Sequence, residues 1–343
     1  MQAPKHIVVI RFSAMGDVAM AVPVIKAVLQ QYPHVYITFV SNAFHAPLFD
    51  NIERCDFYPA YTKAAHKGIR GIWKLYAGLK KQQHFDAVAD LHSVLRSNLL
   101  RKFFRLAGVV NAVIDKGRAA KKFLTSKENK QLNQLPTSHE RYATVFAKLG
   151  FPIDLKAENL VVVKEVFPAK LEGLIQRNKQ LIGIAPFAQH IEKMYPLEKM
   201  KQLLLQLGER DDVQLLFFGA PGKEAGILEE WSNEIPCSFN VAGKISFKEE
   251  LQLISQLTLM VSMDSANMHL ASIYGVPVVS IWGATHPFAG FYGWRQDVNN
   301  IIQADLFCRP CSVFGNKPCY RGDHACMQMI STDMVKQKIA MNL

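Results

Sequence analysis

One stretch of this chain, residues 257–287, constrains its fold more than any other. Residues 257–262 form an apolar run long enough for a buried strand, and residues 276–282 form a second run. Between the two runs a short helix is predicted, and Gly275 ends it. Two nearly continuous apolar strands joined by a helix predict a parallel β-α-β unit whose sheet is covered on both faces.

The turn between the first strand and this helix, Asp264-Ser265-Ala266, is a candidate binding site. Ligands of parallel sheets bind at the carboxyl ends of the strands, and this turn lies at such an end. Asp264 or Ser265 would cap the helix. The free backbone N–H groups of the first helical turn favour an anion such as a phosphate. On the spacing alone, an ordinary capped helix without a ligand remains the alternative.

The N-terminal residues show the same order of strand, turn and helix. A strand over residues 6–12 is followed by a turn through Ser13, Gly16 and Asp17, then by a helix over residues 18–31 and another strand. This is the opening of an α/β domain. The turn contains no G-x-G-x-x-G sequence, so the dinucleotide fingerprint is absent.

The charge of the chain is concentrated in one segment. The net charge is +11, and residues 60–130 contain 16 Lys or Arg against 4 Asp or Glu. Such a segment predicts an anionic partner: a nucleic acid, an anionic membrane surface or a phosphorylated substrate. No apolar run reaches the length of a transmembrane helix, and the N-terminus lacks the apolar region of a signal peptide. We therefore expect a cytoplasmic protein.

The motifs of the second half carry a family resemblance. They are Asp-Ser-x-x-Met-His-Leu-Ala from Asp264, Gly-Val-Pro-Val-Val from Gly275 and Gly-x-Thr-x-Pro from Gly283. This series resembles the signature of the lipopolysaccharide heptosyltransferase family, glycosyltransferase family 9, with Ala266 in place of the family's glycine. The resemblance implies an α/β protein of the GT-B fold, in which two Rossmann-like domains present parallel sheets to a central cleft.

The resemblance also implies a reaction and its partners. The enzyme would be an inverting glycosyltransferase that moves a heptose from ADP-heptose to the inner core of a lipid A-linked lipopolysaccharide. It would require no cofactor. Because the implied acceptor is an anionic glycolipid, the protein would work as a peripheral protein at the cytoplasmic face of the inner membrane, with no nucleic acid partner.

In the family's first motif, which here spans Ser13 to Asp17, the aspartate is the proposed general base. A sugar hydroxyl that attacks an anomeric carbon loses its proton, and a carboxylate can accept that proton. The residues alone fit a helix cap as well. The acceptor-binding residues that we assign from the resemblance and from their position are Ser13, Gly16, His92 and Arg96. For Arg96, an exposed helix arginine is the alternative.

The donor side is implied by three further motifs. Its implied residues are Lys193, Glu224, Asp264, Ser265, Ala266 and His269. Lys193, in a sequence like the family's Lys-x-Trp-Pro, would contact the diphosphate. Glu224 would accept hydrogen bonds from the ribose hydroxyls, and Asp264 would contact the donor sugar. Lys193 could also be one surface lysine among many, and His269 a buried packing residue.

The expected domain order follows from length and motifs. Residues 1–168 would form the N-terminal acceptor-binding domain and residues 169–330 the C-terminal nucleotide-sugar-binding domain. Residues 331–343 would form a helix that crosses back to the first domain. A basic loop over residues 119–134 would order on acceptor binding, and a strand is expected at residues 160–163.

Four of the six cysteines fall in one irregular loop, as Cys308, Cys311, Cys319 and Cys326. Four thiolates could hold a structural zinc ion, although only one C-x2-C pair is present. Free thiols are the alternative for a cytosolic protein, and disulfides are disfavoured there.

Two other functions compete with heptose transfer. One is another nucleotide-sugar transferase or an epimerase of the same fold. The other is a basic nucleic-acid-binding protein whose α/β domains are a scaffold. The second alternative predicts salt-sensitive binding to RNA or DNA and no affinity for an ADP-sugar. The chain contains no recognisable nucleic-acid-binding module.

Overall fold

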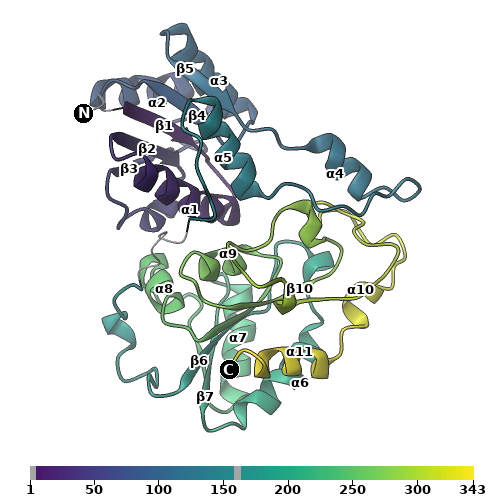
Figure 1. Ribbon diagram of the computed structural model, residues 1–343. Helices are drawn as coiled ribbons and strands as arrows, with labels where there is room; N and C mark the ends of the chain where they lie inside the picture. Colours follow the sequence, from purple (N-terminus) through teal and green to yellow (C-terminus); the bar gives the residue numbers. More distant parts are fainter. Residues whose placement is uncertain (1–4, 158–163) are drawn as a thin grey trace. The chain divides into compact units, whose positions relative to one another are not determined.

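The structure is a computed structural model that describes residues 5–157 and 164–343. The chain folds as two units, of which unit 1 comprises Met1–Lys116 and Pro136–Val161 and unit 2 comprises Gly117–Leu135 and Val162–Leu343 (Figure 1). No helix in the described part of the chain is both long enough and apolar enough to span a membrane. The strand expected at residues 160–163 falls outside the described residues.

Unit 1 is built on a sheet of five parallel strands in the order β3-β2-β1-β4-β5. The strands are β1 (Lys5–Ile10), β2 (Val35–Ser41), β3 (Cys55–Pro59), β4 (Ala87–Asp90) and β5 (Val110–Val113). From β1 the chain builds the sheet outward to β3 on one side and then from β4 to β5 on the other. The strand order therefore reverses between β1 and β4, and a sheet of this kind binds its ligand at such a point.

Helices cover both faces of this sheet (Figure 1). They are α1 (Met15–Gln31), α2 (Gly68–Gln82), α3 (Leu95–Leu106) and α5 (Ser138–Lys148), with the short helix η1 (Ala43–Leu48) after β2. Helices α2 and α3 pack together, and Ile72, Leu75 and Phe104 from them join Val8 and Ile10 of β1 in one buried cluster. Because side chains alternate along a strand, the other side of β1 faces α1 and α5.

Unit 2 is built on six parallel strands in the order β11-β10-β9-β6-β7-β8. The strands are β6 (Gln180–Ala185), β7 (Val213–Phe217), β8 (Ser238–Asn240), β9 (Leu259–Met263), β10 (Val278–Trp282) and β11 (Ile301–Gln303). The helices are α6 (Leu197–Gly208), α7 (Lys223–Glu234), α8 (Phe247–Ile254), α9 (Ala266–Ser272), α10 (Ala325–Gln328) and α11 (Thr332–Ala340), with short helices η2 (Ala169–Leu171), η3 (Ile191–Lys193), η4 (Pro287–Ala289) and η5 (Val298–Asn300).

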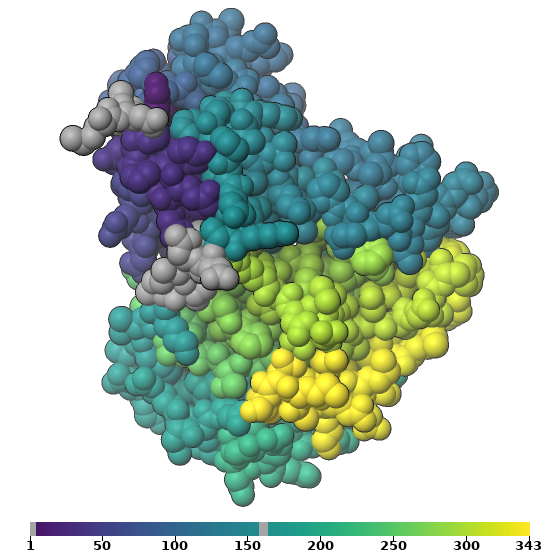
Figure 2. All heavy atoms as spheres, viewed as in Figure 1, coloured from purple at the N-terminus to yellow at the C-terminus, as the bar shows by residue number. Residues whose placement is uncertain are grey.

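Residues 117–135, here called the inserted segment, belong to unit 2 although the chain of unit 1 runs on both sides of them. The segment was expected to be a basic loop of the first domain, but it begins with α4 (Arg118–Leu124) and contacts the later part of unit 2. The Lys130 ammonium donates to the carbonyls of Phe307, Arg309 and Pro310 at 2.9, 2.9 and 3.2 Å. In Figure 2 the segment, in blue-teal, lies against the yellow-green residues of unit 2.

The closing helix α11 also differs from its expected place. Instead of returning to the first domain, it packs against α6 in unit 2. Its residues Val335 and Ile339 are fully buried in the same cluster as Leu203 and Leu207 of α6. The apolar side of this helix therefore has its partner within unit 2.

Candidate functional site

The turn after β1 holds Asp17 in a fixed position. Helix α1 begins at Met15, and Asp17 in its first turn accepts a hydrogen bond from the Ala14 N–H at 3.3 Å. The capping contact that was the alternative for Asp17 is therefore present. Its carboxylate also pairs with the Arg11 guanidinium, Nη2 to Oδ2 at 2.5 Å. About a quarter of the side chain, 27%, remains exposed, so a substrate can reach it.

Arg11 ties this carboxylate to the sheet. The arginine is buried, and its Nη1 donates to the Leu91 carbonyl, just after β4, at 2.7 Å. Burial alone would lower the pKa of Arg11, but the net shift is upward because Tyr142 and Asp17 favour the charged form. The Tyr142 hydroxyl donates to the backbone carbonyl of Asp17 at 3.2 Å, which adds a contact from α5.

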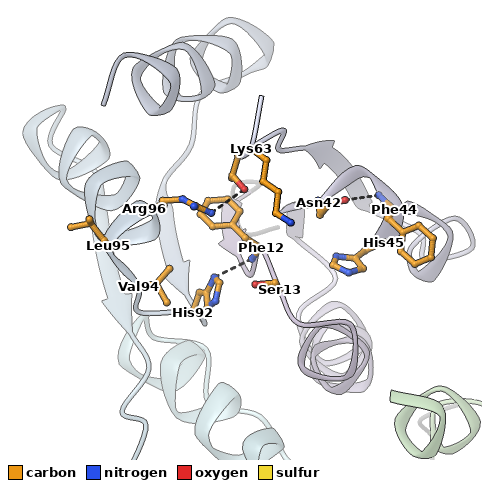
Figure 3. A pocket seen from close by; sticks show the side chains of 11 residues that line it. Phe12, Ser13, Asn42, Phe44, His45, Lys63, His92, Val94, Leu95 and Arg96 are labelled. Atoms are coloured by element: carbon orange, nitrogen blue, oxygen red, sulfur yellow. Dashed lines mark hydrogen bonds between the residues drawn. The ribbon is translucent and has the colours of Figure 1, made fainter. Parts of the chain in front are cut away.

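A cavity of about 660 Å³ opens at the carboxyl ends of the unit 1 strands (Figure 3). Its lining residues are Phe12, Ser13, Asn42, Phe44, His45, Thr62, Lys63, His92, Val94, Leu95 and Arg96. Of the residues expected to bind the acceptor, Ser13, His92 and Arg96 lie around this cavity. Gly16 is not among the residues that line it.

The lining favours an anionic ligand. Lys63 and Arg96 contribute positive charge, and Arg96 Nη1 contacts the Thr62 hydroxyl at 3.3 Å. Burial, together with the nearby Arg11 and other cations, lowers the pKa of His92 to about 3. Burial also lowers the pKa of His45. Both imidazoles are thus neutral near pH 7, and His92 Nδ1 accepts a hydrogen bond from the Phe12 N–H at 3.3 Å.

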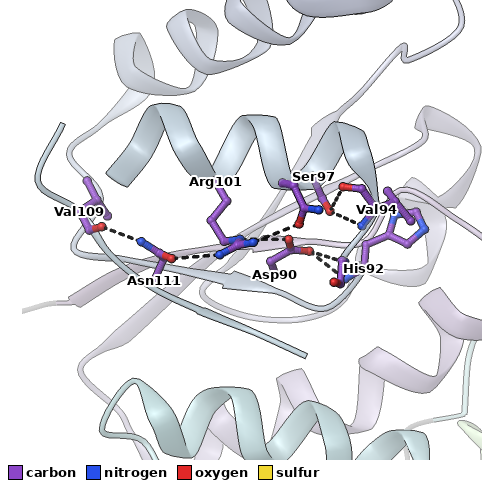
Figure 4. A network of polar contacts seen from close by, with 9 residues as sticks. Asp90, His92, Val94, Ser97, Arg101, Val109 and Asn111 are labelled. Atoms are coloured by element: carbon purple, nitrogen blue, oxygen red, sulfur yellow. Dashed lines mark hydrogen bonds and ion pairs between the residues drawn. The ribbon is translucent and has the colours of Figure 1, made fainter. Parts of the chain in front are cut away.

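A buried ionic network supports this side of the cavity (Figure 4). Asp90, the last residue of β4, is fully buried, and its Oδ1 accepts hydrogen bonds from the backbone N–H groups of His92 and Ser93, both at 2.9 Å. Its Oδ2 lies 3.4 Å from Nε of Arg101 on α3. Asp90 therefore fixes the turn that presents His92 to the cavity.

In unit 2, three side chains meet beyond the ends of three neighbouring strands. Lys193 follows β6, Asp264 follows β9 and Thr285 follows β10. Lys193 Nζ lies 3.0 Å from Asp264 Oδ2, and the Thr285 hydroxyl donates to the same oxygen at 2.8 Å. Asp264 is buried and Lys193 keeps 14% of its side chain exposed.

The other residues expected on the donor side lie in varied surroundings. Ser265 precedes α9, whose first residue is Ala266, and its hydroxyl contacts that of Ser262 at 3.1 Å. His269 is buried within α9, as its packing alternative requires. Glu224 is the second residue of α7 and accepts a hydrogen bond from the Ala220 N–H at 2.7 Å, so it holds the turn before its own helix.

The four cysteines of the irregular loop are neighbours. Cys308, Cys311, Cys319 and Cys326 line one cavity of about 20 Å³, and all four are free thiols. Within residues 5–157 and 164–343, no group of three or more His, Cys, Asp or Glu side chains is arranged to hold a metal ion.

Several residues of these sites were not identified from the sequence. Arg11 reads as an ordinary strand residue, and Lys63 falls in an irregular turn. Asp90 offers a usable signal, because a charged residue inside a short apolar strand is rarely fully buried without a partner. Thr285 appears in a motif, but its contact with Asp264 depends on the tertiary fold.

Comparison with known proteins identifies relatives along most of the chain. A model of the family described as Glycosyltransferase family 9 (heptosyltransferase) matches residues 72–318. The lipopolysaccharide core heptosyltransferase OpsX of Haemophilus influenzae is 23% identical over 292 residues, which cover 83% of this chain and 81% of that protein. Lipopolysaccharide heptosyltransferase 3 of Escherichia coli K12 is 25% identical over 299 residues, 84% of each chain.

Solved structures show the same fold. A glycosyltransferase family 9 protein from Veillonella parvula aligns with a TM-score of 0.76 at 19% identity and covers 100% of this chain and 98% of its own. The E. coli heptosyltransferase WaaC, solved with ADP, aligns with a TM-score of 0.67 at 18% identity over 98% and 97% of the two chains. The expected GT-B fold, with two parallel sheets flanked by helices, is confirmed.

Proposed function

The chain belongs to glycosyltransferase family 9, the heptosyltransferases, and on this premise we propose that it transfers a heptose from ADP-heptose to a lipopolysaccharide core acceptor. The names of the relatives support this acceptor class, and the ADP in WaaC supports the donor. The protein would act as a peripheral protein at the cytoplasmic face of the inner membrane. Family membership favours this function over a nucleic-acid-binding role.

The observation that carries the proposal is that Asp17 lies in the same turn as Ser13, which lines a cavity with Lys63 and Arg96. Asp17 is held by Arg11 and remains partly exposed, while Ser13, His92 and Arg96 line the cavity. Lys63 and Arg96 would pair with phosphate or carboxylate groups of the acceptor. The carboxylate of Asp17 would then accept the proton of the acceptor hydroxyl.

The donor would bind in unit 2, beyond the ends of β6, β9 and β10. Lys193 would offset the charge that builds on the ADP leaving group, and Asp264 would contact the sugar. The backbone N–H groups of Ser265 and Ala266 would donate hydrogen bonds to the diphosphate oxygens, and the Glu224 carboxylate would accept hydrogen bonds from the ribose hydroxyls.

The reaction is a single displacement at the anomeric carbon. The acceptor oxygen forms a bond to that carbon as its bond to the diphosphate oxygen breaks, which inverts the configuration. The hydroxyl proton passes to Asp17, and ADP leaves with the bonding electron pair. No step in this scheme requires a metal ion.

The base is tested by Asp17→Asn, which keeps the size of the side chain and removes its ability to accept a proton. Turnover should fall by roughly 10²–10⁴-fold, while the affinity for ADP stays unchanged. Asp56→Asn, at an exposed position of β3, is the matched control and should keep full turnover. Wild-type turnover in Asp17→Asn would reject the role.

The donor is tested by titrating ADP-heptose, UDP-sugars and GDP-sugars against thermal unfolding, since a bound donor raises the melting temperature. ADP-heptose should give the largest rise. Lys193→Met should weaken ADP binding by roughly 10–100-fold, because a hydrogen bond to a charged group contributes about 1.5–3 kcal/mol. Lys201→Met, at a half-buried lysine of α6 that pairs with Glu234, is the control. A preference of the wild-type protein for a UDP- or GDP-sugar would contradict the donor assignment.

A further inference from the structure

The buried arginine of the cysteine-containing loop has an unusual set of acceptors. We call residues 306–327 the cysteine loop. Arg309 within it is 4% exposed. Its guanidinium donates to three backbone carbonyls, those of Gly283 at 2.5 Å, Ala304 at 2.5 Å and Thr285 at 3.0 Å, and also to the side chain of Gln303 at 3.1 Å.

The carbonyls of Gly283 and Thr285 lie at the two ends of a short segment that follows β10. Arg309 therefore holds residues 283–285 at both ends. In the middle of this loop, the Ala284 carbonyl accepts hydrogen bonds from the N–H groups of Cys311 and Ser312 at 3.0 and 3.2 Å. The Ala284 N–H donates to the Glu192 carbonyl at 3.1 Å, one residue before Lys193. The cysteine loop thus fixes the backbone of residues 283–285 by several contacts.

This backbone carries a side chain of the proposed donor site. The Thr285 hydroxyl donates to Asp264, and Asp264 pairs with Lys193. A displacement of residues 283–285 would remove this hydrogen bond and change the position of the carboxylate. Because Asp264 is buried, the loss of one of its polar partners is not readily replaced by water.

The same loop also supports Lys193 directly. Gly315 has a φ of +75°, and a Cβ atom at this position would lie 2.5 Å from both Cγ and Cδ of Lys193. The aliphatic part of Lys193 therefore passes directly over the Gly315 backbone. Another residue at position 315 would push the lysine away and would also be strained at this φ.

We propose that Arg309 is a positioning residue of the donor site, acting through residues 283–285 to hold Thr285, Asp264 and Lys193 in their binding arrangement. The proposal rests on the proposed function, in which Lys193 and Asp264 receive the donor and Thr285 holds Asp264. Arg309 itself makes its contacts with carbonyls behind the site. Lysine cannot replace it, because a single ammonium cannot reach acceptors spread over the planar guanidinium.

The first experiment needs no ligand. The rate at which an acylating reagent labels Lys193 is measured by mass spectrometry in the wild type, Arg309→Lys and Thr285→Val. In the wild type the ammonium is paired and mostly buried, so labelling is slow. Both variants should raise the rate at least threefold. Arg210→Lys, at an exposed arginine of unit 2, is the matched control and should leave the rate unchanged.

The second experiment measures ADP affinity by calorimetry. Arg309→Lys and Thr285→Val should each weaken ADP binding about tenfold. The double variant should bind ADP no more weakly than the weaker single variant, because both substitutions act through the same Thr285–Asp264 hydrogen bond. An unchanged labelling rate in folded Arg309→Lys overturns the proposal, and so do additive losses of affinity. If the wild type does not bind ADP, the proposed function fails, and the labelling rates still decide the positioning role.

A second variant covers the case in which Arg309→Lys does not fold. Lys130→Met removes three hydrogen bonds to the carbonyls of the cysteine loop and leaves Arg309 in place. It should raise the labelling of Lys193 about twofold. Labelling at the wild-type rate in a folded Lys130→Met protein would then overturn the proposal.

Discussion

Replacing Arg101 by methionine tests the buried network behind the unit 1 cavity. The substitution removes the cation that lies 3.4 Å from Asp90 and keeps most of the aliphatic stem. The Asp90 side chain has no exposed surface, so water cannot take the place of the lost partner. Its only remaining hydrogen bonds among the described contacts are those from the N–H groups of His92 and Ser93.

The magnitude follows from the distance and the burial. Two unit charges 3.4 Å apart attract by about 5 kcal/mol at an effective dielectric constant near 20. Breaking a buried ion pair by removing one partner costs about 3–5 kcal/mol. Because Arg101 keeps 23% of its side chain exposed, solvent screens the pair, and we expect the lower end, about 3 kcal/mol.

The assay is thermal and urea unfolding of Arg101→Met, Asp90→Asn and the double variant. For a unit of this size, about 3 kcal/mol corresponds to a fall of roughly 10 °C in the melting temperature. The double variant should recover about 2 kcal/mol relative to Arg101→Met, since no unpaired charge is left buried. A loss below about 1 kcal/mol in Arg101→Met, or a double variant less stable than it, would refute the reasoning.

Four further substitutions test other parts of the structure. Burial raises the pKa of the Glu250 carboxyl to about 7 from its ordinary 4.5. The wild-type protein therefore loses stability as the pH rises from 4.5 through 7, because the buried carboxyl must ionise. Glu250→Gln should raise the melting temperature at pH 8 and have little effect at pH 4. Gly208→Ala would place a Cβ atom 2.6 Å from the Pro236 carbonyl oxygen and should lower the free energy of urea unfolding by about 1–3 kcal/mol. Gly226→Ala, in α7, would place its Cβ atom where no other atom lies within 4 Å and should raise that free energy by about 0.5–1 kcal/mol. Tyr142→Phe removes the hydrogen bond to the Asp17 carbonyl and should cost about 1 kcal/mol in the same measurement.

The sequence pattern was sufficient to predict an α/β protein with parallel strands, because the strands are short apolar runs and the turns carry clear signals, whereas the GT-B arrangement was implied by the family resemblance. The runs at residues 257–262 and 276–282 appear as β9 and β10, shifted by two residues at their starts. Gly275 indeed has a positive φ at the end of the helix between them. Local chemistry alone determines these features, so no knowledge of distant contacts was needed.

The contacts within the candidate sites could not be predicted in the same way. Arg11 and Leu91 are 80 residues apart in the chain, and only the pairing of β1 with β4 brings them together. The inserted segment was polar and basic enough to suggest a flexible loop. Its Lys130 instead donates to carbonyls of a loop about 180 residues later, and composition contains no information about such partners.

The path of the chain through the inserted segment has a consequence for exchanging parts between related enzymes. A hybrid made by joining two related sequences at a single point near residue 161 would take residues 117–135 from one parent and the rest of unit 2 from the other. Its unit 2 would then lack its own Lys130, which donates to three carbonyls, and its own Leu124, which is fully buried. A working hybrid would have to carry residues 117–135 together with residues 162–343 from the same parent. Recombination during evolution would meet the same obstacle, so the two pieces should be inherited together.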